Sequence, residues 1–188
     1  IEELKALVPP PKEPSGAGNA QDWPSVEEEL GIALPSDYRE FALTYGSGRL
    51  GNLFVVYTPF EGSEYSRLVP AVHKVCDVCR RTKANYGPED EGFPYDVFPD
   101  TPGLLPWAHD ENGDHYFWLT EGAPDDWPVI VSDCCGPPWE RYDVQMTTFL
   151  ARVLKHEFPI LYEAPNPDTD FVFEPYTFTE EDRKREEA

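Results

Sequence analysis

LPWAHDENGDHYFWLT, residues 105–120, is the stretch that decides the fold. Leu105–Ala108 and His115–Thr120 are apolar and aromatic runs of strand length, and such runs are typical of β-strands. Between them, Asn112-Gly113 is a strong short-range signal for a hairpin turn. The stretch therefore predicts two strands joined by a tight turn over residues 110–114.

Further strands are predicted on both sides of this hairpin. Trp127–Ser132 and Trp139–Val144 follow it, and Val129–Val131 is apolar at consecutive positions, as in a strand buried on both faces. Asn52–Thr58 precedes the hairpin and carries a run of β-branched and aromatic residues, and Phe171–Phe173 reads as an edge strand. Because the strands after residue 104 are joined by short turns, we expect a mainly antiparallel sheet.

Helices are predicted before, between and after these strands. They are expected at Trp23–Gly31, Leu34–Gly46, Leu68–Asn85 and Thr147–Glu157. In the last three, apolar residues recur at helical spacing, which predicts one buried face on each helix. The chain is therefore expected to be α+β, with a mainly antiparallel central sheet and helices at both ends of the chain packed against it.

The length of 188 residues suits one domain with short extensions. Residues 1–21 contain three consecutive prolines and a segment rich in Gly, Ala and Asn, so they are expected to be a leader and flexible linker. Residues 22–175 are expected to form the single domain. Residues 176–188 are expected to be a charged C-terminal tail.

The net charge is −21, from 36 acidic and 15 basic residues. Such a chain is repelled by nucleic acid and by anionic membranes, because both carry negative charge. It attracts basic surfaces, so we expect a basic protein partner; the alternative is that acidity only keeps the protein in solution. No apolar run reaches the roughly 18 residues of a membrane helix and no secretory signal opens the chain, so we expect a cytoplasmic protein.

An aspartate-rich pattern in the hairpin imitates a calcium loop. Asp110, Asn112 and Asp114 alternate with other residues, and Glu121 occupies the twelfth position. The sixth position is His115, where such loops need glycine for a sharp turn, and the flanking segments read as strands rather than helices. We therefore expect no calcium site here.

The four cysteines do not match a common metal or catalytic motif. Cys76 and Cys79 are separated by two residues, but Cys134 and Cys135 are adjacent, which departs from the usual spacing of a zinc site. No nucleophile elbow, phosphate loop or paired-histidine motif accompanies them. We expect reduced thiols, no metal, no cofactor and no catalytic residue. A small hydrolase or metalloprotein that uses the cysteines and histidines is the least favoured alternative.

Three segments across Trp23–Leu154 carry a recognisable order and spacing of residues. They are Trp23, Glu28, Leu30, Gly31, Leu34, Pro35, Asp37, Tyr38, Phe41, Tyr45, Gly46 and Gly48; then Leu105–Ala108, Glu111–Asp114, Phe117 and Trp118; then Trp127–Val129, Tyr142, Asp143, Met146, Thr147, Phe149 and Leu150. Together they resemble the SMI1/KNR4 family of the SUKH superfamily. The resemblance covers neither residues 1–21 nor the region after about residue 159.

This resemblance implies an α+β domain that works by binding and needs no catalysis. Bacterial members commonly act as immunity proteins, which bind and block a toxin, often a nuclease. Fungal members regulate cell-wall synthesis and signalling through protein contacts. An immunity protein that masks the active surface of a basic toxin domain is therefore the leading hypothesis, and a regulatory interaction module is the alternative.

Two sets of residues follow from these considerations. Motif residues whose expected role is structural are Trp23, Gly31, Pro35, Tyr38, Gly46, Trp107, Asn112, Gly113, Trp118 and Trp127. Turn acids in the predicted β region are expected to bind the partner, because loops on a rigid sheet commonly carry binding residues. These acids are Asp110, Glu111, Asp114, Asp125 and Asp126.

Overall fold

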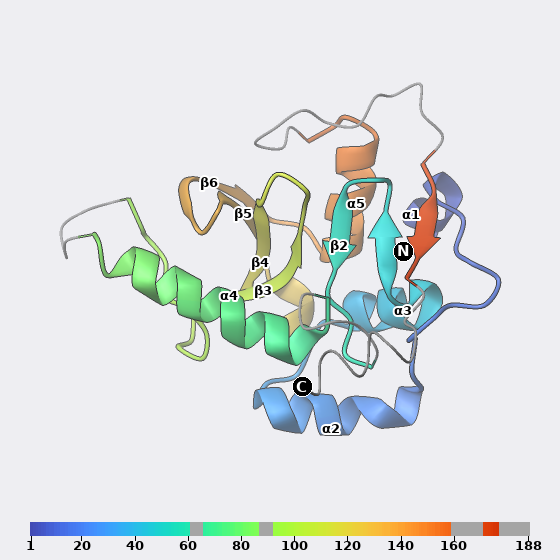
Figure 1. Ribbon diagram of the computed structural model, residues 1–188, viewed down its shortest axis with the longest axis horizontal. Helices are drawn as coiled ribbons and strands as arrows, with labels where there is room; N and C mark the ends of the chain where they lie inside the picture. The colour runs from blue at the N-terminus through green and yellow to red at the C-terminus, as the bar shows by residue number, and fades with distance from the viewer. Residues whose placement is uncertain (61–65, 87–91, 159–170, 177–188) are drawn as a thin grey trace.

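A seven-stranded antiparallel sheet forms the centre of the protein (Figure 1). The computed structural model describes residues 1–60, 66–86, 92–158 and 171–176. The strands within these ranges are β1 (Gly48–Leu50), β2 (Phe54–Val56), β3 (Leu104–His109), β4 (His115–Leu119), β5 (Val129–Asp133), β6 (Gly136–Tyr142) and β7 (Phe173–Pro175). Their order is β6-β5-β4-β3-β2-β1-β7, and every neighbouring pair is antiparallel. The mainly antiparallel sheet predicted from the sequence is confirmed.

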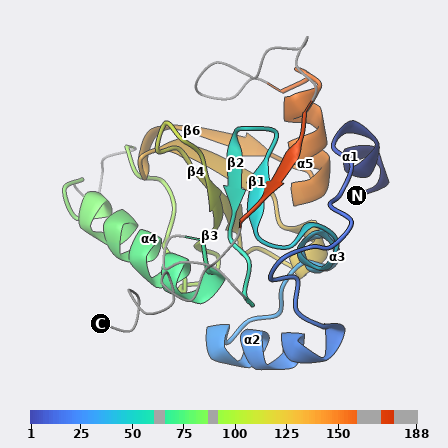
Figure 2. The same cartoon turned by 45° about the vertical axis from the view of Figure 1, so that its right-hand side comes forward.

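Helices cover both faces of this sheet. They are α1 (Glu2–Leu7), α2 (Trp23–Leu30), α3 (Ser36–Tyr45), α4 (Leu68–Lys83) and α5 (Met146–Leu154), with one-turn 3-10 helices η1 (Ala20–Asp22) and η2 (Pro124–Asp126). Helix α4 contacts β3 on one side, whereas α1, α3 and α5 contact one another on the other side (Figure 2). This arrangement confirms the predicted α+β class. No helix in the described ranges is long and apolar enough to cross a membrane.

Aromatic side chains fill the space between the sheet and its helices. The ring of Phe149 in α5 lies 6.2 Å from that of Trp107 in β3, measured between centroids. Trp118 in β4 lies 5.1 Å from Tyr38 in α3, and the Tyr38 hydroxyl donates a hydrogen bond to the Tyr57 carbonyl at 2.7 Å. Full burial of one such ring stabilises a fold by about 1.5–3 kcal/mol. These contacts fix the sheet and the helices in one core.

The motif residues occupy positions where packing or backbone geometry accounts for them. Gly31 and Gly46 end α2 and α3, and Pro35 directly precedes α3. Gly46 has φ 70°, and a Cβ there would lie 2.1 Å from the Ser15 carbonyl oxygen, so no other residue fits without displacing the backbone. The aromatic motif residues are all at most 4% exposed: Trp23, Tyr38, Trp107, Trp118 and Trp127.

The first eight residues of the segment expected as a leader and linker pack on the domain. Leu4 and Val8 are fully buried, and α1 lies against α5. The Tyr45 hydroxyl donates to the Val8 carbonyl at 2.7 Å, and the Ser47 N–H donates to the Ser15 carbonyl at 2.7 Å. These apolar residues thus find a partner surface on the domain. The expected tail falls, from residue 177 onward, outside the described residues.

Candidate functional site: the acidic turn cluster

Asp110 is the hydrogen-bonding centre of the β3–β4 turn. One carboxylate oxygen accepts the backbone N–H groups of Asn112 (2.9 Å) and Asp114 (3.0 Å), and the other accepts the Tyr116 hydroxyl at 2.9 Å. Its side chain is buried, so it holds the turn and is not exposed to a partner as the sequence suggested. Gly113 has φ 91°, whereas Asn112 has a negative φ, so only the glycine is required by the backbone.

Asp114 is the unusual residue of this turn. It is completely buried, and neither carboxylate oxygen has a hydrogen-bond partner among the described residues. Burial, together with the negative charges of Asp110, Asp133 and Glu140, raises the pKa of its carboxyl to about 7, and His115 opposes this rise. A buried polar group without a partner is costly, so this position calls for an explanation.

Acids from two chain segments, the β3–β4 turn and the β5–β6 hairpin, therefore lie at one end of the sheet. The β5–β6 turn lies beside the β3–β4 turn, because β4 pairs with β5 and their turns at this end are neighbours. We name this group the acidic turn cluster; it consists of Asp110, Glu111, Asp114, Asp133 and Glu140. Asp133 and Glu140 were not singled out from the sequence, although the predicted order of antiparallel strands would have placed the two turns at the same end.

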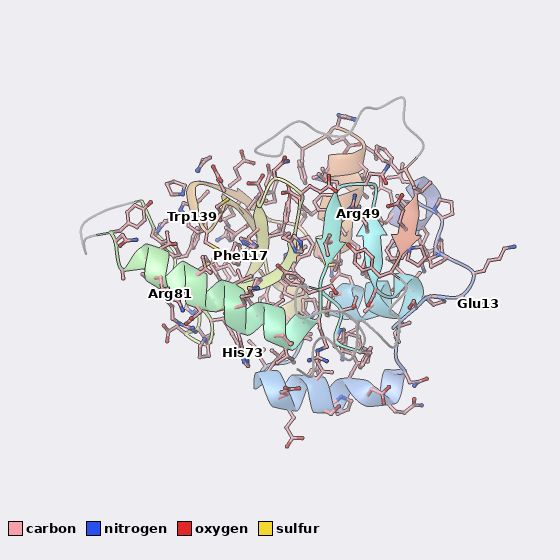
Figure 3. All side chains as sticks on the ribbon, viewed as in Figure 1. Glu13, Arg49, His73, Arg81, Phe117 and Trp139 are labelled. Atoms are coloured by element: carbon pink, nitrogen blue, oxygen red, sulfur yellow. The ribbon has the colours of Figure 1, made fainter. Side chains whose placement is uncertain are left out.

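Glu111 is the most exposed acid of the cluster, with 58% of its side chain accessible. Its carboxylate forms an ion pair with the Arg49 guanidinium of β1 at 2.5 Å, and Figure 3 shows Arg49 on the sheet. This ion pair involves one of the five acids, so the cluster keeps a negative charge. Exposed ion pairs contribute little to stability, so Arg49 does not prevent Glu111 from exchanging partners.

The other two predicted acids lie at the opposite end of β4. Asp125 and Asp126 belong to η2, which follows the end of β4, whereas the β3–β4 turn of the acidic turn cluster lies at its start. The five residues of β4 separate the two sites by roughly 16 Å. Asp125 accepts the Ser36 backbone N–H at 2.6 Å, and this bond lowers the pKa of its carboxyl. Asp126 is exposed. From the sequence, we expected these acids to form one binding surface. In the structure they lie at opposite ends of β4.

The histidines and cysteines form no metal site in the part of the chain that the structure describes, where no group of three or more His, Cys, Asp or Glu side chains could hold a metal ion. Cys134 is exposed while Cys135 points into the core, so the four sulfur atoms do not converge. His109 lies 3.2 Å from the Tyr57 hydroxyl, and burial together with His115 lowers its pKa to about 4.

A groove of about 800 Å³ lies along α4 and is also lined by Leu30 and by Phe98 and Pro99. Its charged lining consists of Lys74, Arg80 and Arg81 and one acid, Asp77. Figure 3 shows His73 and Arg81 along the helix, with Phe117 and Trp139 on the neighbouring sheet. Asp77 and Arg81 are paired at 2.5 Å, so part of this charge is neutralised within the helix.

Comparisons with known proteins point to one family. The family model SUKH_6, described as SMI1-KNR4 cell-wall, matches residues 20–143, which include the whole acidic turn cluster. No curated protein matches the chain. A solved structure of a protein from Pseudomonas syringae pv. tomato is similar at 18% identity, with 76% of this chain and 87% of that chain covered and a TM-score of 0.43. Because the family model matches well over half of the sequence, the chain belongs to the SMI1/KNR4 family of the SUKH superfamily.

Proposed function

We propose that this chain is a non-catalytic protein-binding domain, an immunity protein that neutralises a toxin by covering its active surface. Membership of the SMI1/KNR4 family supports this role, because bacterial members commonly act in this way. The net charge of −21 fits a basic partner. A nuclease is such a partner, since its active surface must attract phosphate groups.

The acidic turn cluster is the proposed binding site, and Asp114 is the observation that carries it. Its buried carboxylate has no hydrogen-bond partner among the described residues, and three neighbouring acids repel its negative charge. Asp114 itself is closed to a partner, so a lysine or arginine of the toxin would pair with the exposed acids around it. Positive charge held there would also offset the buried negative charge of Asp114 without touching it.

The exposed members of the cluster would guide the partner toward Asp114. Glu111 reaches solvent, and Asp133 and Glu140 are partly exposed on the adjoining hairpin. Complementary charge raises the association rate and fixes orientation more than it raises affinity. Occlusion of the active surface requires a contact of about 800 Å² on each partner. This area is larger than the acidic turn cluster, so the interface must also include the surrounding turns. This mechanism uses no metal and no cofactor.

The role is tested by identifying a toxin domain encoded by an adjacent gene and measuring its inhibition by this protein. We expect one equivalent of the wild-type protein to abolish its activity. The triple variant Glu111→Lys, Asp133→Lys, Glu140→Lys should inhibit poorly, while Asp110 and Asp114 stay in place to keep the turn. The matched control reverses three exposed acids elsewhere, Glu13, Glu28 and Glu29, of which the last two lie on α2.

The outcomes separate the role from the site. Unaffected toxin activity in the presence of wild-type protein would reject the immunity role for that toxin. Equal inhibition by wild type and the triple variant would instead place the interface elsewhere, with Asp125 and Asp126 at the other end of β4 as the next positions to reverse.

A further inference from the structure

A small cavity of about 180 Å³ lies between α4 and the sheet, where the helix packs against β3 (Figure 1). One stripe of α4 forms its first wall, because residues three and four positions apart share a face of a helix. The stripe consists of Ala71, Lys74, Val75 and Val78. Ala71 and Val75 are buried, whereas Val78 is 41% exposed, so Val78 lies where the cavity opens to solvent.

Three rings from neighbouring strands form the second wall. Tyr57 directly follows β2, and His109 and His115 are the cross-strand pair next to the β3–β4 turn. The ring centroids of Tyr57 and His109 are 5.5 Å apart, and those of His109 and His115 are 6.5 Å apart. The Tyr57 hydroxyl lies 3.2 Å from Nδ1 of His109, and this hydrogen bond fixes the two rings relative to each other. The second wall is thus a row of three rings.

The chemistry of these walls favours an uncharged group. Of the described residues, no Asp or Glu lines the cavity, and Lys74 is its one lysine or arginine. Burial, together with the charge of His115, lowers the pKa of His109 to about 4, so the His109 ring is neutral at physiological pH. A lysine or arginine of a partner would lose its water here and gain no counter-charge, which is costly.

The size of the cavity favours one side chain over a whole ligand. Pockets for small molecules and cofactors typically measure about 300–1,000 Å³, which is more than this cavity offers. An aromatic ring bound here would face the three rings on one side and the side chains of Ala71, Val75 and Val78 on the other. Contacts between aromatic rings are favourable beyond the area they bury, so an aromatic side chain gains more here than an aliphatic one.

The cavity adjoins the acidic turn cluster. His109 directly precedes Asp110 and His115 directly follows Asp114, so the turn that carries the cluster connects two residues of the cavity wall. A partner that covers this turn would also cover the opening of the cavity. Tight interfaces commonly combine a buried aromatic anchor with a polar rim, and the cavity and the cluster are placed to supply these two parts.

We propose that this cavity receives one phenylalanine or tyrosine side chain from the protein that binds the acidic turn cluster. The inference rests on the proposed function, because it adds an apolar anchor to the same interface. The acids would govern orientation and association rate. The anchored ring would mainly slow dissociation, because most differences in affinity between related complexes arise in the dissociation rate.

Titration of the purified full chain with p-cresol, the side-chain analogue of tyrosine, tests the cavity without the toxin. Nuclear magnetic resonance should show saturable shifts of the Val75 and Val78 methyl signals and of the His109 ring signals at millimolar p-cresol. Butylammonium, the side-chain analogue of lysine, should leave these signals unchanged, because the cavity has no counter-charge for it.

Three variants relate these shifts to the cavity. Val75→Phe fills the cavity with a ring of its own and should abolish p-cresol binding. Val78→Gln alters the exposed rim and should weaken binding several-fold, and it serves where Val75→Phe fails to fold. His73→Phe is the matched control, because His73 is exposed on α4 and does not line this cavity. It should bind p-cresol as wild type does.

The toxin identified for the proposed function tests the source of the ring. Val75→Phe and Val78→Gln should raise its dissociation constant by about tenfold or more, whereas His73→Phe should change it by no more than about twofold. Toxin binding by Val75→Phe as tight as wild type would overturn the inference, and the cavity would then take small aromatic molecules only.

Absence of any shift at the cavity residues of the wild-type chain in p-cresol would also overturn the inference, and it would leave the proposed function standing. A wild-type chain that does not bind the toxin would instead reject the proposed function and, with it, the toxin side chain as the occupant. The two failures are therefore read in different experiments.

Discussion

The carboxylate of Asp37 in α3 accepts the backbone N–H of Thr147 in the first turn of α5 at 2.8 Å. The contact is buried and joins residues 110 positions apart in the sequence. It satisfies one of the N–H groups that every helix leaves free at its N-terminus. Burial raises the pKa of the Asp37 carboxyl, and the bonds to Thr147 oppose this rise. Asp37 thus fixes α5 relative to α3 beneath the sheet.

Asp37→Ala should lower the free energy of unfolding by about 1–3 kcal/mol, because it leaves a buried N–H without an acceptor. The comparison is Asp125→Ala, which removes a similar bond to Ser36 at the surface. Water replaces that acceptor, so a loss of about 0.5–1 kcal/mol is expected. Urea unfolding of both variants measures the difference. Equal losses would show that burial of the Asp37 cap carries no additional stability.

Asp110→Ala should cost about 1–3 kcal/mol, because three donors in the β3–β4 turn lose their acceptor. Gly113→Val should also destabilise, since valine at φ 91° is strained. Asn112→Ala should change stability by no more than about 0.5 kcal/mol, because its side chain is exposed and its φ is negative. Thermal unfolding of the three variants tests this order; a larger loss for Asn112→Ala than for Asp110→Ala would contradict it.

Asp114→Asn should stabilise the isolated protein at neutral and alkaline pH. The pKa of Asp114 is raised from 3.8 to about 7 in the folded state, so the folded chain binds this proton more tightly than the unfolded chain. Stability linked to this group is therefore complete below about pH 4 and is lost as the pH rises to about 7. The variant should match wild type near pH 4 and exceed it by about 1–3 kcal/mol near pH 8.

Asp100→Asn serves as the control for this pH dependence, because Asp100 is exposed on a loop. Its urea midpoint should follow wild type at every pH. If the Asp114→Asn profile also runs parallel to wild type, then Asp114 ionises normally in the folded protein, and the argument for an unpartnered buried charge fails.

Elements with a strong local signal were predictable from the sequence. The helix predicted at Leu68–Asn85 is α4, Leu68–Lys83, and the strand predicted at His115–Thr120 is β4, His115–Leu119. Their apolar periodicity directly reflects the surface they bury. Helix α1 lies in the segment expected as a leader and linker, because six residues are too few for a helix to be stable alone. It forms because Leu4 and Val8 pack on the domain, which is tertiary information.

The candidate site was predictable only in part. The sequence drew attention to the acids at residues 110–114, but it could not show that Asp110 accepts backbone N–H groups and that Asp114 is buried. Both properties depend on the path of the turn. Cys134-Cys135 forms a left-handed turn without the Asn or Gly that usually marks one, so no local signal was present.

Association with the toxin domain should slow as salt rises, by roughly tenfold or more between low and high ionic strength. In the proposed complex, Glu111 and the partly exposed Asp133 and Glu140 would attract a basic partner over a distance that salt shortens, to a Debye length of about 8 Å at physiological ionic strength. Stopped-flow association rates for wild type, the triple lysine variant and the Glu13, Glu28, Glu29 control measure this dependence. The triple variant should associate slowly at low salt and show a flat salt dependence, whereas the control should keep most of the wild-type slope. Since long-range attraction acts before contact, dissociation rates should vary less than association rates. A wild-type rate that is indifferent to salt would reject electrostatic guidance by the acidic turn cluster, and an interface built on apolar contacts would then have to account for binding.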